Sequence, residues 1–125
     1  MHYTCDSKTG KYINDGSNTI PESTKIPSIH AETGLAVEYL GTAGYRLYFH
    51  NETRTIHELA YTSANTVGNS GPVSNDPASS MALAAALYSK TNLTITYVRD
   101  QSNIGVTNYN SDGNWHVCMW HHTAV

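Results

Sequence analysis

The sequence predicts an all-β fold built from repeated antiparallel sheets, and two observations lead to this prediction. Two stretches follow the same pattern 48 residues apart and align without a gap, residues 35–61 with residues 83–109. Charged residues make up only 14% of the chain, and Tyr, Thr, Ser, Asn and Gly take their place, a balance that favours β-structure. A period of this size, filled by short alternating strands, is typical of β-propeller blades.

Each copy of the repeat predicts three short strands, because apolar and polar residues alternate between turn residues. After the second copy, a turn at residues 110–114 precedes an alternating stretch at 115–120, which predicts a fourth strand. We therefore expect blades of four-stranded antiparallel sheets. The other expected strands span residues 35–40, 45–49 and 55–61 in the first copy, and residues 83–88, 93–97 and 103–109 in the second.

Residues 81–87 are rich in alanine and could form a helix by propensity alone. Their counterpart in the first copy is short and contains Val37 and Tyr39, so we predict a strand. Small residues also suit an inner propeller strand, where blades crowd near the axis. The segment 62–80, rich in Ser, Asn, Gly and Pro, is expected to be a loop between the copies.

The chain begins with a further pair of expected strands, residues 2–5 and 11–14, which resemble the second and third strands of a blade. The chain would then hold about two and three-quarter blades. These are an incomplete blade at 1–29 and blades at 30–80 and 81–125. This number cannot close a ring, and open sheet edges invite pairing with another chain. We expect either a homo-oligomer that completes a propeller or a piece of a longer propeller.

Composition argues against several function classes. The net charge is −3 and the sequence has no basic patch, so nucleic acid is not an expected partner. The longest apolar run, residues 81–88, is too short to span a bilayer, and residues 1–20 show no apolar core of a secretory signal. We expect no membrane insertion and leave the location open. Cys5 and Cys118 could form one long-range disulfide or remain two buried free thiols.

Arg46 and Glu58 are the expected polar groups of a ligand site. They lie on the second and third strands of the first copy, side by side on one face. The Arg fork of five donors and the two acceptor oxygens of Glu can clamp adjacent hydroxyls of a sugar. The alternative is a plain cross-strand ion pair. The second copy has Thr94 and Val106 at these positions, so we expect one site and not one per blade.

Tyr109 and Trp115 are the aromatic candidates, because a sugar stacks its C–H face on such rings. The alternative is that both rings only pack between blades. Tyr97 and Trp120 are expected in the core.

No catalytic pair is expected. His57 and Glu58 are neighbours in one strand, and neighbours in a strand point to opposite faces. We find no other nucleophile with a base, so the protein is not expected to be an enzyme. His116, His121 and His122 lack the pattern of a zinc site, and a solvated tail is expected there. We expect no metal and no cofactor.

These residues make the chain resemble the fungal fucose-specific lectins, a group of six-bladed β-propellers with bacterial relatives built from two-blade subunits. The sequence departs from the family pattern at Thr94 and Val106, at the absent inner-strand Trp, and at Trp115, which comes one residue late. The matching residues are 35–37, 45–49, 56–58 and Tyr61 in the first copy, and 81–87, 93–97, 104–106, Tyr109 and 112–115 in the second.

The resemblance implies a carbohydrate-binding lectin whose partners are fucosylated glycans or glycoproteins. By this resemblance Arg46 and Glu58 would bind fucose hydroxyls, and Tyr109 and Trp115 from the next blade would stack on the sugar. At the start of the chain, His2 and Asn14 stand at the Arg and Glu places. The other function considered is a propeller scaffold for protein contacts in which sugar binding has been lost or altered.

Overall fold

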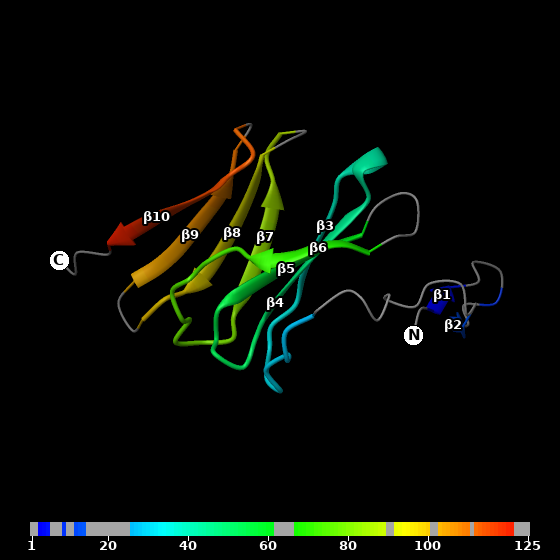
Figure 1. Cartoon of the computed structure of the whole chain (residues 1–125), viewed down its shortest axis with the longest axis horizontal. Coiled ribbons are helices and arrows are strands. Elements are labelled where there is room, and N and C mark those ends of the chain that lie inside the picture. The colour runs from blue at the N-terminus through cyan, green and yellow to red at the C-terminus, as the bar shows by residue number, and fades with distance from the viewer. Residues whose placement is uncertain are drawn as a thin grey trace.

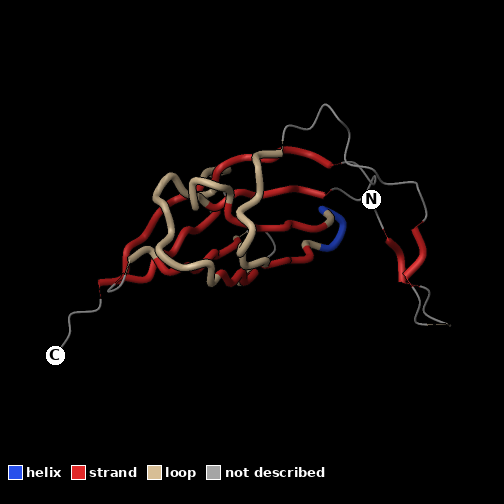
Figure 2. The backbone as a smooth tube through the Cα atoms, turned by 90° about the horizontal axis from the view of Figure 1, so that it is seen from below, coloured by secondary structure: helices blue, strands red, loops and turns tan. Residues whose placement is uncertain are grey.

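The structure, a computed structural model, describes residues 3–5, 9, 12–14, 26–61, 67–89, 92–100, 103–110 and 112–121. This part of the chain is built from strands and loops, with one short helical turn, η1 (Gly41–Ala43) (Figure 2). The strands form two four-stranded antiparallel sheets and a separate two-stranded one (Figure 1). The all-β prediction is confirmed. Within the described residues, no helix has the length and apolar character needed to cross a membrane.

The first sheet is a simple meander in which each strand pairs with the next one along the chain. Turn residues fit the tight connections: Gly41 and Gly44 have positive φ around η1, and Arg54 has positive φ in the following turn. The register shifts between Leu59 and Tyr61, where the last strand joins. Its strands are β3 (Ala36–Tyr39), β4 (Tyr45–His50), β5 (Ile56–Tyr61) and β6 (Val67–Pro72).

The second sheet repeats this meander. The alanine-rich stretch forms its first strand, as predicted, and the stretch after the Asp112 turn forms its last. Its strands are β7 (Leu83–Leu87), β8 (Leu93–Val98), β9 (Asn103–Tyr109) and β10 (Trp115–His121). The four-stranded sheets fall within the expected 30–80 and 81–125 units. His116 and His121 belong to β10 and not to a tail, but the His116 side chain is solvent-exposed as expected.

The 48-residue offset holds for whole strands. β4 and β8 begin at residues 45 and 93, and β6 and β10 begin at residues 67 and 115. The expectation that residues 62–80 form only a loop is therefore wrong, because β6 lies inside this segment. Its sequence, Val-Gly-Asn-Ser-Gly-Pro, lacks alternation and ends in Pro72, yet it pairs with β5 as an edge strand, where proline is tolerated.

The two sheets pack face to face, and the face that each uses is not the equivalent one. We call front the face of the first sheet that carries Arg46 and Tyr48, and the face of the second sheet that carries their counterparts Thr94 and Thr96. The other faces are called back. The front of the first sheet packs on the back of the second, and we call this contact the internal seam. Its buried residues are Ala36, Tyr48 and Ile56 from the first sheet and Ile95 and Tyr97 from the second.

The first strands of the two sheets, β3 and β7, approach each other closely where they begin. A Cβ on Gly34, just before β3, would overlap the carbonyl group of Met81, just before β7. Glycine is therefore required at this close approach.

A connecting segment, residues 73–82, crosses from one sheet to the other. Val73 and Ala78 are buried in the internal seam, and the Ser74 hydroxyl lies 2.9 Å from the Tyr97 hydroxyl. The segment also bonds to both sheets through its backbone. The Ala78 N–H donates to the Arg54 carbonyl, and the Ser79 N–H donates to the Val98 carbonyl. The segment thus fixes how the two sheets lie relative to each other.

The chain start forms the expected hairpin, in which β1 (Tyr3–Cys5) and β2 (Tyr12–Asn14) pair antiparallel. The rest of the expected incomplete blade at 1–29 lies largely outside the described residues. Trp120 belongs to β10, but its side chain also lies outside them, whereas Tyr97 is in the core as predicted. Cys118 is a free thiol on the exposed surface, so the expectation of a buried thiol is wrong for it.

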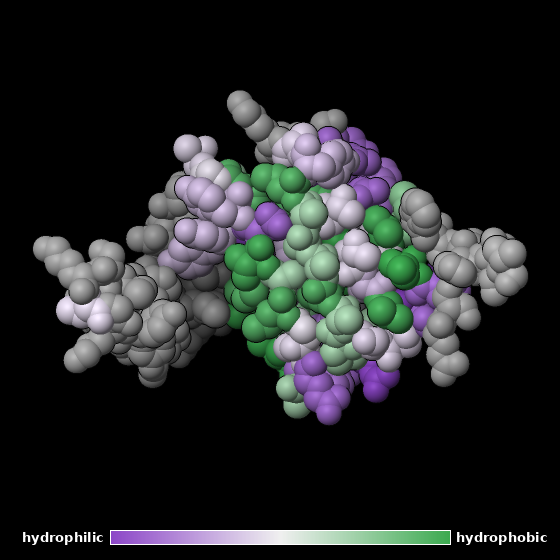
Figure 3. Space-filling view, turned by 180° about the vertical axis from the view of Figure 1, so that it is seen from behind, coloured by the Kyte–Doolittle hydropathy of each residue, from purple (hydrophilic) through white to green (hydrophobic). Residues whose placement is uncertain are grey.

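Two faces of the molecule are left uncovered. On the back of the first sheet, Val37 is 57% and Tyr39 58% exposed. On the front of the second sheet, Ile104 is 51% exposed. The space-filling view in Figure 3 shows apolar side chains gathered over the middle of one side of the molecule. Exposed apolar area of this kind commonly marks an interaction surface.

Candidate functional site

The Arg46 and Glu58 side chains lie on the front of the first sheet and face the internal seam. Arg46 is opposite Ala60 and Tyr48 is opposite Glu58, so Arg46 and Glu58 are diagonal neighbours on one face. Arg46 Nε lies 3.9 Å from Glu58 Oε1, and both side chains are 19% exposed. At this distance the two groups attract electrostatically without forming a direct hydrogen bond. The predicted placement of this pair on one face is confirmed.

Arg46 and Glu58, which we call the clamp, are each held by a further group. Arg46 Nη1 donates to the Ala43 carbonyl at 3.1 Å and to the Tyr45 carbonyl at 3.0 Å. Glu58 Oε2 accepts a hydrogen bond from the Tyr48 hydroxyl at 2.9 Å. Among the described residues, Arg46 Nη2 and Glu58 Oε1 make no hydrogen bond. These two atoms can therefore serve hydroxyl groups of a ligand.

Burial sets the electrostatics of the site. Burial raises the pKa of Glu58, and the Tyr48 hydrogen bond and the Arg46 charge oppose this rise. The pKa of Tyr48 is raised far above its ordinary value by burial, then by the charge of Glu58 and the hydrogen bond to it. Tyr48 therefore stays a neutral donor, and the carboxylate of Glu58 is easier to protonate than an exposed one.

The aromatic candidates lie on the other side of the seam. Trp115 and Tyr109 are cross-strand partners at one end of the second sheet, with ring centroids 5.2 Å apart. Trp115 also meets Tyr48 edge to face, at 6.1 Å and 87°. The four predicted site residues are thus joined in one chain of contacts, with Tyr48 as the link between the polar clamp and the aromatic pair.

A hollow of about 460 Å³ lies at the end of the seam where η1 is. None of the four predicted site residues lines it, but its lining residue Ala43 accepts a hydrogen bond from Arg46 through its carbonyl. Its lining residue Leu87 lies in the same cross-strand row as Tyr109 and Trp115, with Leu93 between them. In Figure 1, η1 and the β7–β8 turn lie at the same end of the two sheets. The residues that line the hollow are Tyr39, Leu40, Gly41, Thr42, Ala43 and Leu87.

Sequence reasoning missed Tyr48 as a member of the site. The strand alternation contained the signal, because Tyr48 lies two residues after Arg46 and therefore on the same face. Glu38 was also missed; it lies directly opposite Arg46 on β3. The hollow at η1 could not be found from the strand pattern, because it depends on how the two sheets pack.

The structure also bears on the other residues considered near the site. His57 and Glu58 do lie on opposite faces, since His57 is opposite Phe49 and its ring stacks there at 6.1 Å. Asp112 is a turn residue as predicted and accepts a hydrogen bond from the Asn114 N–H. His116 is exposed and lies 2.7 Å from an Asp112 oxygen. This bond lowers the pKa of Asp112, after the larger effect of the backbone bond from Asn114.

Comparison of this chain with protein-family models, with curated proteins and with solved structures found no match. The resemblance to fucose-specific lectins is therefore a hypothesis that rests on the residues and the geometry described above.

Proposed function

We propose that this protein is a carbohydrate-binding lectin that binds L-fucose or fucosylated glycans in the internal seam. The observation that carries the proposal is that Arg46 and Glu58 face the seam together with Trp115 and Tyr109 from the neighbouring sheet. Guanidinium and carboxylate groups supply directional partners for adjacent hydroxyls, and aromatic rings supply a surface for the C–H face of a sugar.

The proposal includes the architecture. The two sheets would be successive blades of a β-propeller, and further copies of the chain would complete the ring. The front-to-back packing, the four-stranded meanders and the 48-residue offset of whole strands support this. Recognition without reaction is expected, because the sequence shows no nucleophile with an activating base.

Selectivity would come from the cost of leaving buried polar groups unpaired. A sugar epimer that misplaces one hydroxyl would leave Arg46 or Glu58 without a partner, at a cost of about 1–3 kcal/mol per group. Weak binding at single sites would be strengthened by avidity when several chains form one ring.

The test is calorimetric titration of the full chain with L-fucose. Arg46→Ala and Glu58→Ala should each weaken binding by at least about tenfold, the effect of one buried polar partner. The chain offers matched controls at the equivalent places of the second sheet: Thr94→Ser and Val106→Ala should leave the affinity unchanged. Unchanged binding in a doubly substituted Arg46→Ala, Glu58→Ala protein that remains folded would contradict the site.

A scaffold for protein contacts is the second candidate, because the second sheet has uncharged Thr94 and Val106 where the first has its clamp. Absence of binding heat with millimolar fucose and a folded protein would favour this candidate. The same titration thus separates the two functions.

A further inference from the structure

The two uncovered faces of the molecule correspond to the two faces that are already in contact inside it. The internal seam joins the front of the first sheet to the back of the second. The back of the first sheet and the front of the second are left exposed. Contacts of this head-to-tail kind repeat from copy to copy and close into rings when the rotation allows it.

The open front of the second sheet can be compared directly with the covered front of the first. Ile56 is fully buried in the seam, whereas its counterpart Ile104 is 51% exposed. Ala36 is buried and Ala84 is exposed. The second sheet therefore presents apolar positions whose equivalents in the first sheet are covered by a neighbouring sheet.

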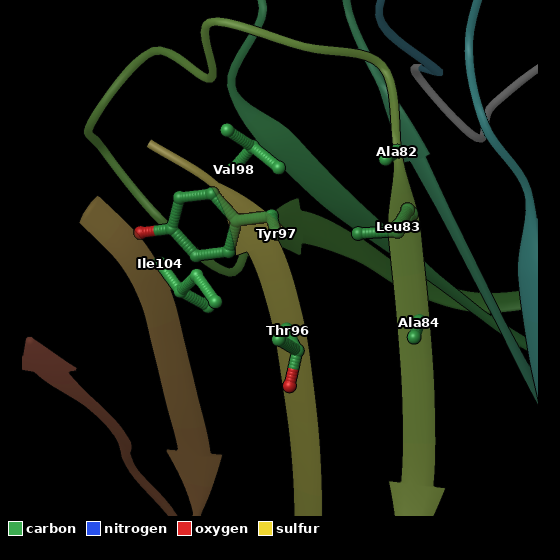
Figure 4. Close-up of a pocket in the computed structure, with 7 residues that line it drawn as sticks. All are labelled: Ala82, Leu83, Ala84, Thr96, Tyr97, Val98 and Ile104. Atoms are coloured by element: carbon green, nitrogen blue, oxygen red, sulfur yellow. The ribbon is translucent and has the colours of Figure 1, made fainter. Parts of the chain in front are cut away.

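A shallow apolar hollow of about 220 Å³ lies at this open front (Figure 4). Ala84, Thr96, Val98 and Ile104 lie on the front, whereas Leu83 and Tyr97 are cross-strand partners whose side chains point to the back. The equivalent region of the first sheet, at Ala36, Tyr48, His50 and Ile56, is buried. The residues that line the hollow are Ala82, Leu83, Ala84, Thr96, Tyr97, Val98 and Ile104.

The open back of the first sheet has the matching character. In the second sheet, Leu93 and Ile95 on the back are buried, and Ile95 packs in the internal seam. The counterpart of Leu93 is Tyr45, which is 49% exposed, and the counterpart of Ile95 is Leu47, which is half-buried. Tyr39 and Tyr45 stack on this open back, with ring centroids 4.8 Å apart.

Charge also distinguishes the open front from the covered one. The front of the first sheet carries Glu38, Arg46 and Glu58, which the 48-residue offset replaces with Ala86, Thr94 and Val106. A contact made through the open front would therefore bury none of these charges, and it avoids the desolvation cost of buried ions.

From these correspondences we propose that the open front of the second sheet binds the open back of the first sheet of a second copy of this chain. The seam between copies is apolar and lacks the clamp, so it carries no polar ligand site, and each chain contributes one such site. This inference rests on the blade architecture proposed above and not on sugar binding.

The test is the mass of the full chain in solution, measured by light scattering over a dilution series. We expect a multiple of the 13.7 kDa monomer. Val37→Asp on the back and Ile104→Asp on the front should each give monomers, because a charge would be buried in the contact. Asn75→Asp, at an exposed position of the connecting segment, is the matched control and should keep the wild-type mass.

Mixing the two variants tests the head-to-tail geometry. Each variant retains one working face, so an equimolar mixture should form a complex of two chains and nothing larger. Circular dichroism checks that both Asp variants fold. If they do not fold, Val37→Thr and Ile104→Thr take their place, and these milder substitutions should weaken assembly about tenfold.

Several outcomes would overturn the inference. A wild-type chain that is monomeric at every concentration would show that the open faces bind no second copy. Folded variants that assemble like the wild type, or that fail to pair when mixed, would also overturn it. A chain that assembles but gives no heat with fucose would contradict only the proposed sugar binding.

Discussion

The front faces of the two sheets can be compared position by position, because their strands share one 48-residue frame. The first sheet has Arg46, Tyr48 and Glu58 where the second has Thr94, Thr96 and Val106. The strands form equally well with both sets. The comparison teaches that these side chains are not needed to make a four-stranded sheet, so the charged pair Arg46 and Glu58 requires an explanation other than strand formation.

The largest expected effect concerns Tyr48 and its counterpart Thr96. Tyr48→Ala should destabilise the protein by about 3–5 kcal/mol, because it removes a fully buried aromatic side chain and the edge contact to Trp115. Thr96→Ala, on the open front, should change stability by less than about 0.5 kcal/mol. Urea unfolding of both variants measures the difference. Equal effects would show that Tyr48 does not tie the two sheets together.

A smaller effect is expected where an aromatic ring covers a residue of the neighbouring strand. In the first sheet Phe49 stacks on His57, and in the second Tyr97 covers Gly105. A Cβ on Gly105 would lie 2.6 Å from Tyr97 Cε2, and the Tyr97 hydroxyl lies 2.9 Å from the Ser74 hydroxyl, which limits its movement.

Gly105→Ala should therefore cost about 1–3 kcal/mol through overpacking. Gly71→Ala is the matched control, because its Cβ would meet nothing within 4 Å. Thermal unfolding compares the two variants. A neutral Gly105→Ala substitution would mean that the Tyr97 ring can move aside.

The smallest expected effect is a pH dependence confined to the first sheet. His50 and His57 correspond to Val98 and Gly105, which do not titrate. Among the described residues, His50 Nε2 and His57 Nδ1 are buried without a hydrogen-bond partner. Burial lowers the pKa of both rings below 6.5, and the nearby His30 adds to this for His50.

The folded chain consequently binds fewer of these protons than the unfolded chain, and stability should fall as the pH falls through 6.5. The raised pKa of Glu58 acts in the opposite direction at lower pH, where the folded state takes up its proton first. The measurement is the urea midpoint from pH 7.5 to 5.5, for the wild type and for His50→Val, His57→Gly. Both proteins retain Glu58, so an equal pH dependence would exclude the histidines as its source.

Much of the fold could be predicted from the sequence, because each expected strand could be checked against the equivalent residues 48 positions away. Residues 81–87 show this, since propensity alone favours a helix and the counterpart with Val37 and Tyr39 indicates a strand. The edge strand β6 was not predicted, because pairing with β5 stabilises a sequence that has no strand pattern of its own.

The site was predictable only in part. Alternation placed Arg46 and Glu58 on one face, and the tendency of sugars to stack on aromatic rings indicated Tyr109 and Trp115, which the resemblance then supported. The position of Tyr48 opposite Glu58 depends on the register of β4 and β5, and its contact with Trp115 depends on the packing of two sheets. The exposure of Cys118 likewise depends on which faces the packing covers.

The connecting segment has a consequence for the cooperativity of unfolding. In many repeat proteins each unit can open on its own, because it touches its neighbours only across an interface. Here Val73 is buried in the seam and its N–H donates to the Ile56 carbonyl, whereas Ser79 bonds to Val98 in the other sheet. Separation of the sheets would break both attachments and expose the segment. The two sheets should therefore melt in a single transition, and neither sheet alone is expected to retain its structure.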